Sequence, residues 1–226
     1  MTTRPAGRWV IMAMLWTTVA PAGADTPAPQ SRSIPVPEGD GRPILIDGIF
    51  TPGEWDDARK VELAPNVELL VKRTTSFVYV GVRFAKPDPR DFHGSVDLLL
   101  SSDGTSIRQL HAGAQLGERP LNGAAEPDAA PAFVWGDTRD WVANESRWNE
   151  RKVADLMEKG KDRDAALKQS MYESDGYEFQ IRKSKFAAGT WLLRIRAFVP
   201  PGLTREFFPA GTSFTSTAGW FRLRLE

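Results

Sequence analysis

Two tryptophans in the middle of the chain, Trp135 and Trp141, stand among polar side chains that could bind a sugar. Arg139 lies between them, with Asp137 before it and Asn144 after it. Indole rings stack on the apolar faces of pyranose rings, while charged and amide groups form hydrogen bonds with hydroxyls. This pattern predicts a carbohydrate-binding surface that contains Trp135, Trp141 and Arg139. The alternative is that these tryptophans only pin a neighbouring helix to the protein body.

Several aspartates fall at expected loops or strand ends and suggest a second kind of site. Calcium is bound by cages of carboxylate and carbonyl oxygens. Asp47, Asp57 and Asp97 are the candidate calcium ligands, and Asp56 and Asp103 lie in similar places. The alternative is that these aspartates form turns and face the solvent.

Other chemistry has little support in the sequence. His93 and His111 are the only histidines, and they belong to separate segments, whereas a metal site needs several converging ligands. No Gly-x-Ser-x-Gly motif is present, and no pair of carboxylates is marked for hydrolysis. The absence of cysteine excludes disulfides, thiolate ligands and thiol catalysis. We therefore predict a protein without enzymatic activity.

Charge and the N-terminal residues indicate where the protein is found. The 226 residues include 29 basic and 29 acidic side chains, and this balance excludes the basic field that nucleic acid or an anionic membrane attracts.

The N-terminal residues are typical of a secretory signal peptide, with Arg4 and Arg8, the apolar run 9–20 and the small residues 22–24. We expect cleavage after Ala24, no membrane segment in the mature chain, and a periplasmic or secreted protein; the alternative is an uncleaved anchor. Residues 25–43 are rich in proline and predict a linker.

Alternating apolar residues predict an all-β domain over 44–226. The expected strands are 44–46, 67–73, 77–84, 95–100, 107–115, 177–182, 191–199 and 221–225. They are short, separated by turn residues and lack the βαβ rhythm, which favours an antiparallel β-sandwich, jelly-roll-like, with one helical insertion. The insertion covers about 118–174. Within it, apolar residues at helical spacing after Asn149 predict an amphipathic helix, broken at Gly160, that lies over an edge or face of the sandwich.

The stretch 44–58 organises the domain. It reads Ile-Leu-Ile-Asp-Gly-Ile-Phe-Thr-Pro-Gly-Glu-Trp-Asp-Asp-Ala, which predicts a strand, a tight loop and Trp55 as a plug at the end of the core. The Ile-Asp-Gly and Glu-Trp elements resemble the opening of carbohydrate-binding module family 9 and its DOMON-like relatives. Three later segments resemble that family in the same order, namely 77–82 with Asp88-Pro89, 95–100 and 175–178.

The resemblance implies a secreted β-sandwich that mostly lacks catalysis. In xylanase-linked members two tryptophans hold the sugar; the first of these places carries Phe92 here, beside His93, and the second, 207–219, carries phenylalanines. Phe92 therefore joins the candidate sugar-binding residues. Some relatives hold calcium, and some DOMON-like relatives hold haem b through methionine, for which Met157 and Met171 are the candidates.

Together these observations predict an exported, non-catalytic carbohydrate-binding module that takes part in polysaccharide breakdown, with a glycan as its ligand and calcium as the one expected ion. The alternative is a structural or protein-interaction module of the cell envelope with a protein partner and no sugar ligand. A haem b-binding DOMON-like domain is the third reading.

Overall fold

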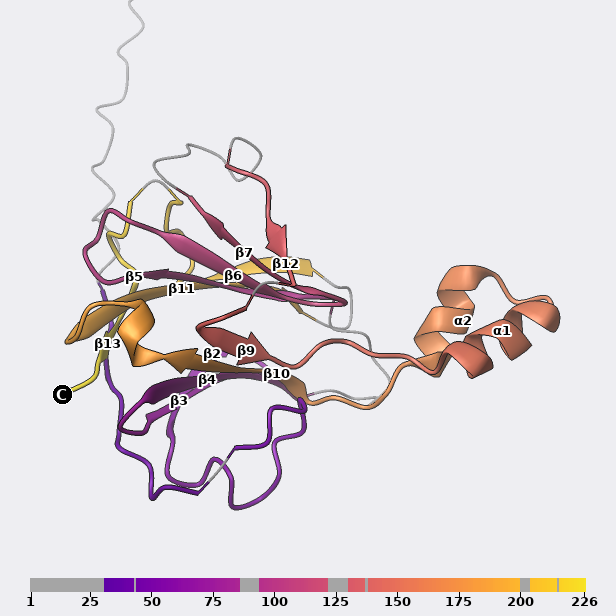
Figure 1. Ribbon diagram of the computed structural model, residues 1–226, viewed down its shortest axis with the longest axis horizontal. Helices are drawn as coiled ribbons and strands as arrows, with labels where there is room; N and C mark the ends of the chain where they lie inside the picture. The colour runs from indigo at the N-terminus through magenta and orange to yellow at the C-terminus, as the bar shows by residue number, and fades with distance from the viewer. Residues whose placement is uncertain are drawn as a thin grey trace, which may run out of the picture.

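A computed structural model shows a mostly β protein with two sheets and two α-helices (Figure 1). The structure describes residues 31–42, 44–85, 94–121, 130–136, 138–199, 204–214 and 216–226. The expected signal peptide, 1–24, lies outside these residues. Within the described ranges, none of the helices is both long enough and apolar enough to cross a membrane.

The larger sheet has eight strands. In spatial order these are β1 (Ser33–Pro35), β13 (Phe221–Arg224), β11 (Thr190–Val199), β5 (Val96–Ser101), β6 (Arg108–Ala112), β7 (Leu116–Pro120) and β8 (Val134–Trp135), and β12 (Thr204–Phe208) also pairs with β11. Every pairing is antiparallel except that of β1 with β13.

The smaller sheet has five antiparallel strands. Their order is β2 (Arg59–Ala64), β3 (Val67–Arg73), β4 (Phe77–Phe84), β10 (Gly176–Arg182) and β9 (Trp141–Ala143). A short 3₁₀ helix, Lys183–Lys185, follows β10.

The main hydrophobic core takes side chains from both sheets. Val78, Val80 and Val82 alternate along β4 and share one buried cluster with Leu98 and Leu100 of β5. Alternate residues of a strand project to opposite faces, so each sheet offers one apolar inner face to this core. The second face of each sheet is its outer face, and most of the polar side chains discussed below lie there.

The predicted strands are confirmed except at the start of the domain and at 107–115, where β6 ends at Ala112 and a bend at 113–115 precedes β7. Ile44–Ile46 forms no strand, and β1 lies instead at 33–35, in the segment predicted to be linker. Ile34 is 1% exposed and belongs to the main core, so the folded body begins before residue 44. The sequence does not reveal this strand, because the many prolines of 25–43 are typical of a linker. In addition, β1 buries only one residue and is held by backbone pairing, so it has no alternating apolar pattern. The strands β2, β7, β8, β9 and β12 were also not predicted.

The insertion contains two helices instead of one covering helix. Asn149 caps α1 (Glu150–Glu158) and Asp162 caps α2 (Arg163–Ser170), each by accepting a hydrogen bond from a backbone N–H. Gly160 lies between the two helices with φ +84°, which confirms the predicted break at this residue. The pair packs on itself and projects away from the sheets (Figure 1), and α1 buries none of its residues. The prediction that the helix covers the sandwich is therefore wrong.

Removing the projecting helices should leave the rest of the protein folded. We expect a chain in which 150–170 is replaced by a short Gly-Ser linker to melt within about 3 °C of the full protein, because little of the main core depends on these helices. Thermal unfolding followed by near-ultraviolet circular dichroism measures this. A loss of cooperative melting would show that the helices are part of the body.

Candidate functional site

Six residues form a continuous line across the outer face of the larger sheet. The pairing partners are Phe207 with Arg196, Arg196 with Asp97, Asp97 with His111, His111 with Gly117, and Gly117 with Trp135. Residues paired on neighbouring strands project from the same side of a sheet. We call these six residues the cross-sheet row. It has an aromatic side chain at each end and charged side chains in the middle.

The middle of the row is a buried carboxylate held between two basic side chains. Oδ1 of Asp97 lies 2.7 Å from Nδ1 of His111, and Oδ2 accepts a hydrogen bond from Nε of Arg196. Although burial favours the neutral acid, the hydrogen bond from His111 and the charge of Arg196 hold the pKa of Asp97 below its ordinary value. The ionised carboxylate only accepts hydrogen bonds, so Nδ1 of His111 carries the proton. In this tautomer Nε2 of His111 is a hydrogen-bond acceptor, and 17% of the side chain is exposed.

Trp135 ends the row and is 52% exposed. Its ring centroid lies 4.8 Å from that of Phe133 and 5.5 Å from that of His111, so the indole rests on other rings and still presents surface to solvent. Gly117 makes this position possible. A Cβ atom at residue 117 would lie 2.6 Å from Cε3 of Trp135. The result is a fixed aromatic platform beside a polar group, an arrangement that suits a sugar ring.

The two tryptophans predicted to bind sugar are not brought together. Trp135 lies on the cross-sheet row, whereas Trp141 is buried in the main core, stacked 6.0 Å from Phe179, and donates its Nε1 hydrogen to Glu118 at 2.9 Å. The prediction that Trp141 belongs to one sugar-binding surface with Trp135 is therefore wrong. Arg139 is exposed in the connection between β8 and β9, and Phe92 and Asp137 lie outside the described residues.

The three predicted calcium ligands are also dispersed. Asp97 is paired with His111 and Arg196, Asp57 is paired with Lys72 at 2.9 Å, and Asp47 accepts the N–H of Ile49 in a local turn. Cationic neighbours do not fit a calcium cage formed by these aspartates. In the ranges that the structure describes, no three or more acidic, histidine or cysteine residues gather in a way that could hold a metal ion.

The two methionines predicted as haem ligands lie on or next to the projecting helices. Met157 is 46% exposed on α1, and Met171 pairs with Trp148 where the helices join the body. An exposed thioether on a projecting helix does not fit an axial haem ligand, which needs an enclosed pocket.

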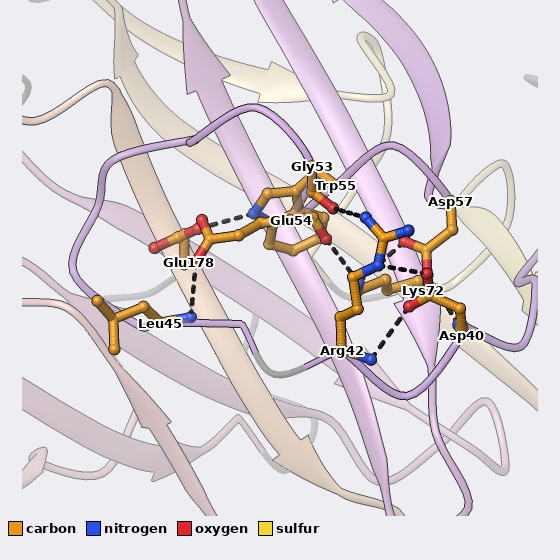
Figure 2. A network of polar contacts seen from close by, with 9 residues as sticks. All are labelled: Asp40, Arg42, Leu45, Gly53, Glu54, Trp55, Asp57, Lys72 and Glu178. Carbon is orange, nitrogen blue, oxygen red and sulfur yellow. Dashed lines mark hydrogen bonds and ion pairs between the residues drawn. The ribbon is translucent and has the colours of Figure 1, made fainter.

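Trp55 belongs to a polar and apolar network on the outer face of the smaller sheet (Figure 2). It packs in a second buried cluster with Ile44, Phe50, Leu70 and Tyr79, which lies apart from the main core. The prediction that Trp55 is buried is confirmed, but it seals the loop 44–58 onto the sheet and does not close the end of the core.

Buried charges fix that loop. Glu178 of β10 is fully buried and accepts hydrogen bonds from Nε1 of Trp55 at 2.8 Å and from the backbone N–H groups of Asp47 and Gly48. Lys72 is also buried, and its Nζ donates to the carbonyl of Glu54 at 2.6 Å and to Asp57. Each polar group of this loop network is satisfied within the protein, so it positions the loop and leaves little for a ligand.

Glu178 should make stability depend on pH. Burial raises its pKa from 4.5 to about 7, and hydrogen bonds from Trp55 and the loop offset only part of this effect. Between those values the folded protein binds more protons than the unfolded chain, so the free energy of unfolding falls as pH rises from about 4.5 to 7, by up to about 3 kcal/mol. Urea unfolding at pH 5 and pH 7.5 measures the difference. The variant Glu178→Gln should show a smaller pH difference than the wild type, and an equal difference would contradict the prediction.

Sequence reasoning did not identify the centre of the cross-sheet row. His111 was read as an isolated surface or core residue and Asp97 as a calcium ligand, because the pairing of β5 with β6 and β11 is not visible in the sequence. A signal was nevertheless present. Asp97 and Arg196 both interrupt aliphatic runs, and such polar residues in buried strands need partners.

Comparisons with family models, with curated proteins and with solved structures each found no match to this chain.

Proposed function

We propose that this protein is an exported, non-catalytic carbohydrate-binding module that takes part in polysaccharide breakdown, and that the cross-sheet row is its sugar-binding site. In this proposal the two sheets form a jelly-roll-like antiparallel β-sandwich, and the ligand lies on the outer face of the larger sheet. The observation that carries it is the half-exposed indole of Trp135 beside His111.

The chemistry of the row supports this choice. Exposure of a large aromatic side chain to water is unfavourable in free energy. Contact with the apolar face of a sugar ring would remove this surface from water. Nε2 of His111 and the guanidinium of Arg196 lie along the same line and can form hydrogen bonds with ring hydroxyls. The central carboxylate of Asp97 holds both groups in place, so the site is organised before a ligand binds.

A glycan array with the mature protein, followed by calorimetric titration of the oligosaccharides it retains, tests the proposal. We expect Trp135→Ala to weaken binding at least 100-fold, because one stacking residue carries much of the energy of a small interface. Trp148→Ala is the matched control, since Trp148 lies near the projecting helices, and it should bind as the wild type does. Binding that is unchanged by Trp135→Ala would exclude this site.

The second candidate is a protein-interaction module, and the projecting helices favour it. Met157 is exposed on α1, and this helix buries none of its residues although it is amphipathic. A protein partner would then bind α1 and α2, and sugar would have no effect on Trp fluorescence. The chain that lacks 150–170 distinguishes the two functions, because it should keep sugar binding and lose partner binding.

A further inference from the structure

A second line of residues runs beside the cross-sheet row, polar except for Leu99, which packs in a third buried cluster with Trp220. Arg194 pairs with Leu99, Leu99 with Gln109, and Gln109 with Arg119, two positions further along each strand and therefore on the same outer face. Two donors in this line are buried and unpaired within the described residues, Nη1 of Arg194 and Nε2 of Gln109. Buried donors without partners are rare in folded proteins, and a water molecule, an ion or a ligand can supply the acceptor.

Arg194 is the less usual of the two because it is a buried charge. Its side chain is 3% exposed, and its guanidinium carbon lies 4.5 Å from the ring centre of Phe207 and 4.0 Å from that of Phe214. Nε donates to Oγ1 of Thr212 at 2.9 Å, and Nη2 donates to the carbonyl of the same residue at 2.7 Å. Both acceptors are neutral, so the charge has no counter-ion among the described residues.

The surroundings add to this positive charge. Burial and the neighbouring Arg196 lower the pKa of Arg194 to about 10, which still leaves it protonated at neutral pH. Arg194 and Arg196 face Asp97 as the one carboxylate on the two lines. The whole chain carries no net charge, so this excess is local to the outer face of the larger sheet.

We propose that the ligand of this site is an acidic oligosaccharide, in which a uronate carboxylate binds Nη1 of Arg194 while another ring stacks on Trp135. This inference rests on the proposed function. Buried arginine next to a neutral amide suits a carboxylate, because the charge-assisted hydrogen bond replaces both the missing acceptor and the missing counter-ion. In this proposal the carboxylate takes the place that the ring of Phe214 occupies in the structure, 4.0 Å from the guanidinium carbon.

The spacing of the strands sets the size of the ligand. Arg194 on β11 and Trp135 on β8 are separated by β5, β6 and β7, which corresponds to four strand spacings or roughly 19 Å. One sugar ring cannot reach both ends. An oligosaccharide can lie along the face, with the partly exposed side chain of His111 between the two ends.

Matched pairs of ligands test this inference without altering the protein. Calorimetric titration compares tetragalacturonate and tetramannuronate with their carboxyl-reduced counterparts, which keep the rings and linkages and lose the charges. We expect the wild-type protein to bind at least one acidic member 10-fold or more tightly than its reduced partner in 50 mM salt. The preference should shrink in 500 mM salt, because salt screens the charge on the outer face.

Two arginine variants locate the effect. Arg194→Gln should lose the preference and bind both members of the pair with the affinity of the reduced one. Arg222→Gln is the matched control, because Arg222 of β13 pairs with Leu192 of β11, lies on the same face as Arg194 and is exposed. This variant should keep the preference for the acidic ligand. Arg194→Lys keeps the positive charge and loses the planar guanidinium, and it replaces Arg194→Gln in the test if that variant does not fold. For Arg194→Lys, the difference in binding free energy between the acidic and the reduced ligand should be less than half of the wild-type difference.

Three results would overturn the inference. Equal affinity of the wild type for acidic and reduced ligands would refute acid selectivity and leave sugar binding at Trp135 intact. An acid preference that Arg194→Gln preserves would place the carboxylate elsewhere. Failure of the wild type to bind either member of any pair, or any glycan on the array, would refute the proposed function and the inference with it.

Discussion

Trp55→Ala is expected to remove most of the folding stability of this protein. The indole is 3% exposed, stacks 5.6 Å from Phe50 and donates a hydrogen bond to the buried carboxylate of Glu178. Truncation of a buried tryptophan costs about 3–5 kcal/mol, and leaving a buried acceptor short of a donor costs about 1–3 kcal/mol more. Because a domain has about 5–15 kcal/mol in total, little soluble protein should remain.

Trp55→Phe separates the two contributions. This variant keeps an aromatic ring in the cluster but removes the N–H donor to Glu178 and part of the indole volume, so it should fold with a smaller loss than Trp55→Ala. Urea unfolding of both variants against the wild type measures the effects. If Trp55→Ala melted within a few degrees of the wild type, the loop 44–58 would not depend on this residue.

The second large effect is expected at Trp141. Its side chain is buried in the main core against Phe179, and its indole N–H satisfies Glu118, which also contacts Lys185 at 2.9 Å. We expect Trp141→Ala to lower the free energy of unfolding by about 3 kcal/mol or more. For a chain of this size, that corresponds to a fall in melting temperature of roughly 6–12 °C.

Trp135→Ala provides the matched comparison for Trp141→Ala. The same substitution at the half-exposed Trp135 should change the melting temperature by only a few degrees. Thermal unfolding of the two variants side by side tests the assignment of one tryptophan to the core and the other to the surface. Equal losses of stability would contradict it.

The sequence predicts the strands of this fold better than it predicts their neighbours. Period-two alternation identifies strands such as 177–182 and 221–225, because each sends alternate side chains into the main core. The short strand β1 escapes prediction, since its proline-rich setting is typical of a linker and its pairing with β13 is long-range. Helix caps are local, and Asn149 and Gly160 therefore mark the helices correctly.

The candidate site shows the same division between local and long-range information. Trp135 could be chosen from the sequence because exposed aromatics among polar residues are a local pattern. Its partners could not, because Asp97, His111 and Arg196 come from three separate strands and only the register brings them together. Trp141 also stands among polar residues in the sequence, yet its pairing with Ile181 of β10 places its side chain on the inner face of the smaller sheet, in the main core.

The indole N–H signals in a nuclear magnetic resonance titration test the central claim most directly. The chain has eight tryptophans, and Trp135→Phe assigns the signal of Trp135 by its disappearance. On addition of an oligosaccharide that the array retains, we predict a large shift of the Trp135 signal, while Trp55 and Trp141, buried in separate clusters, stay in place. A titration in which Trp135 does not move while another indole signal does would contradict the assignment of the cross-sheet row as the sugar-binding site.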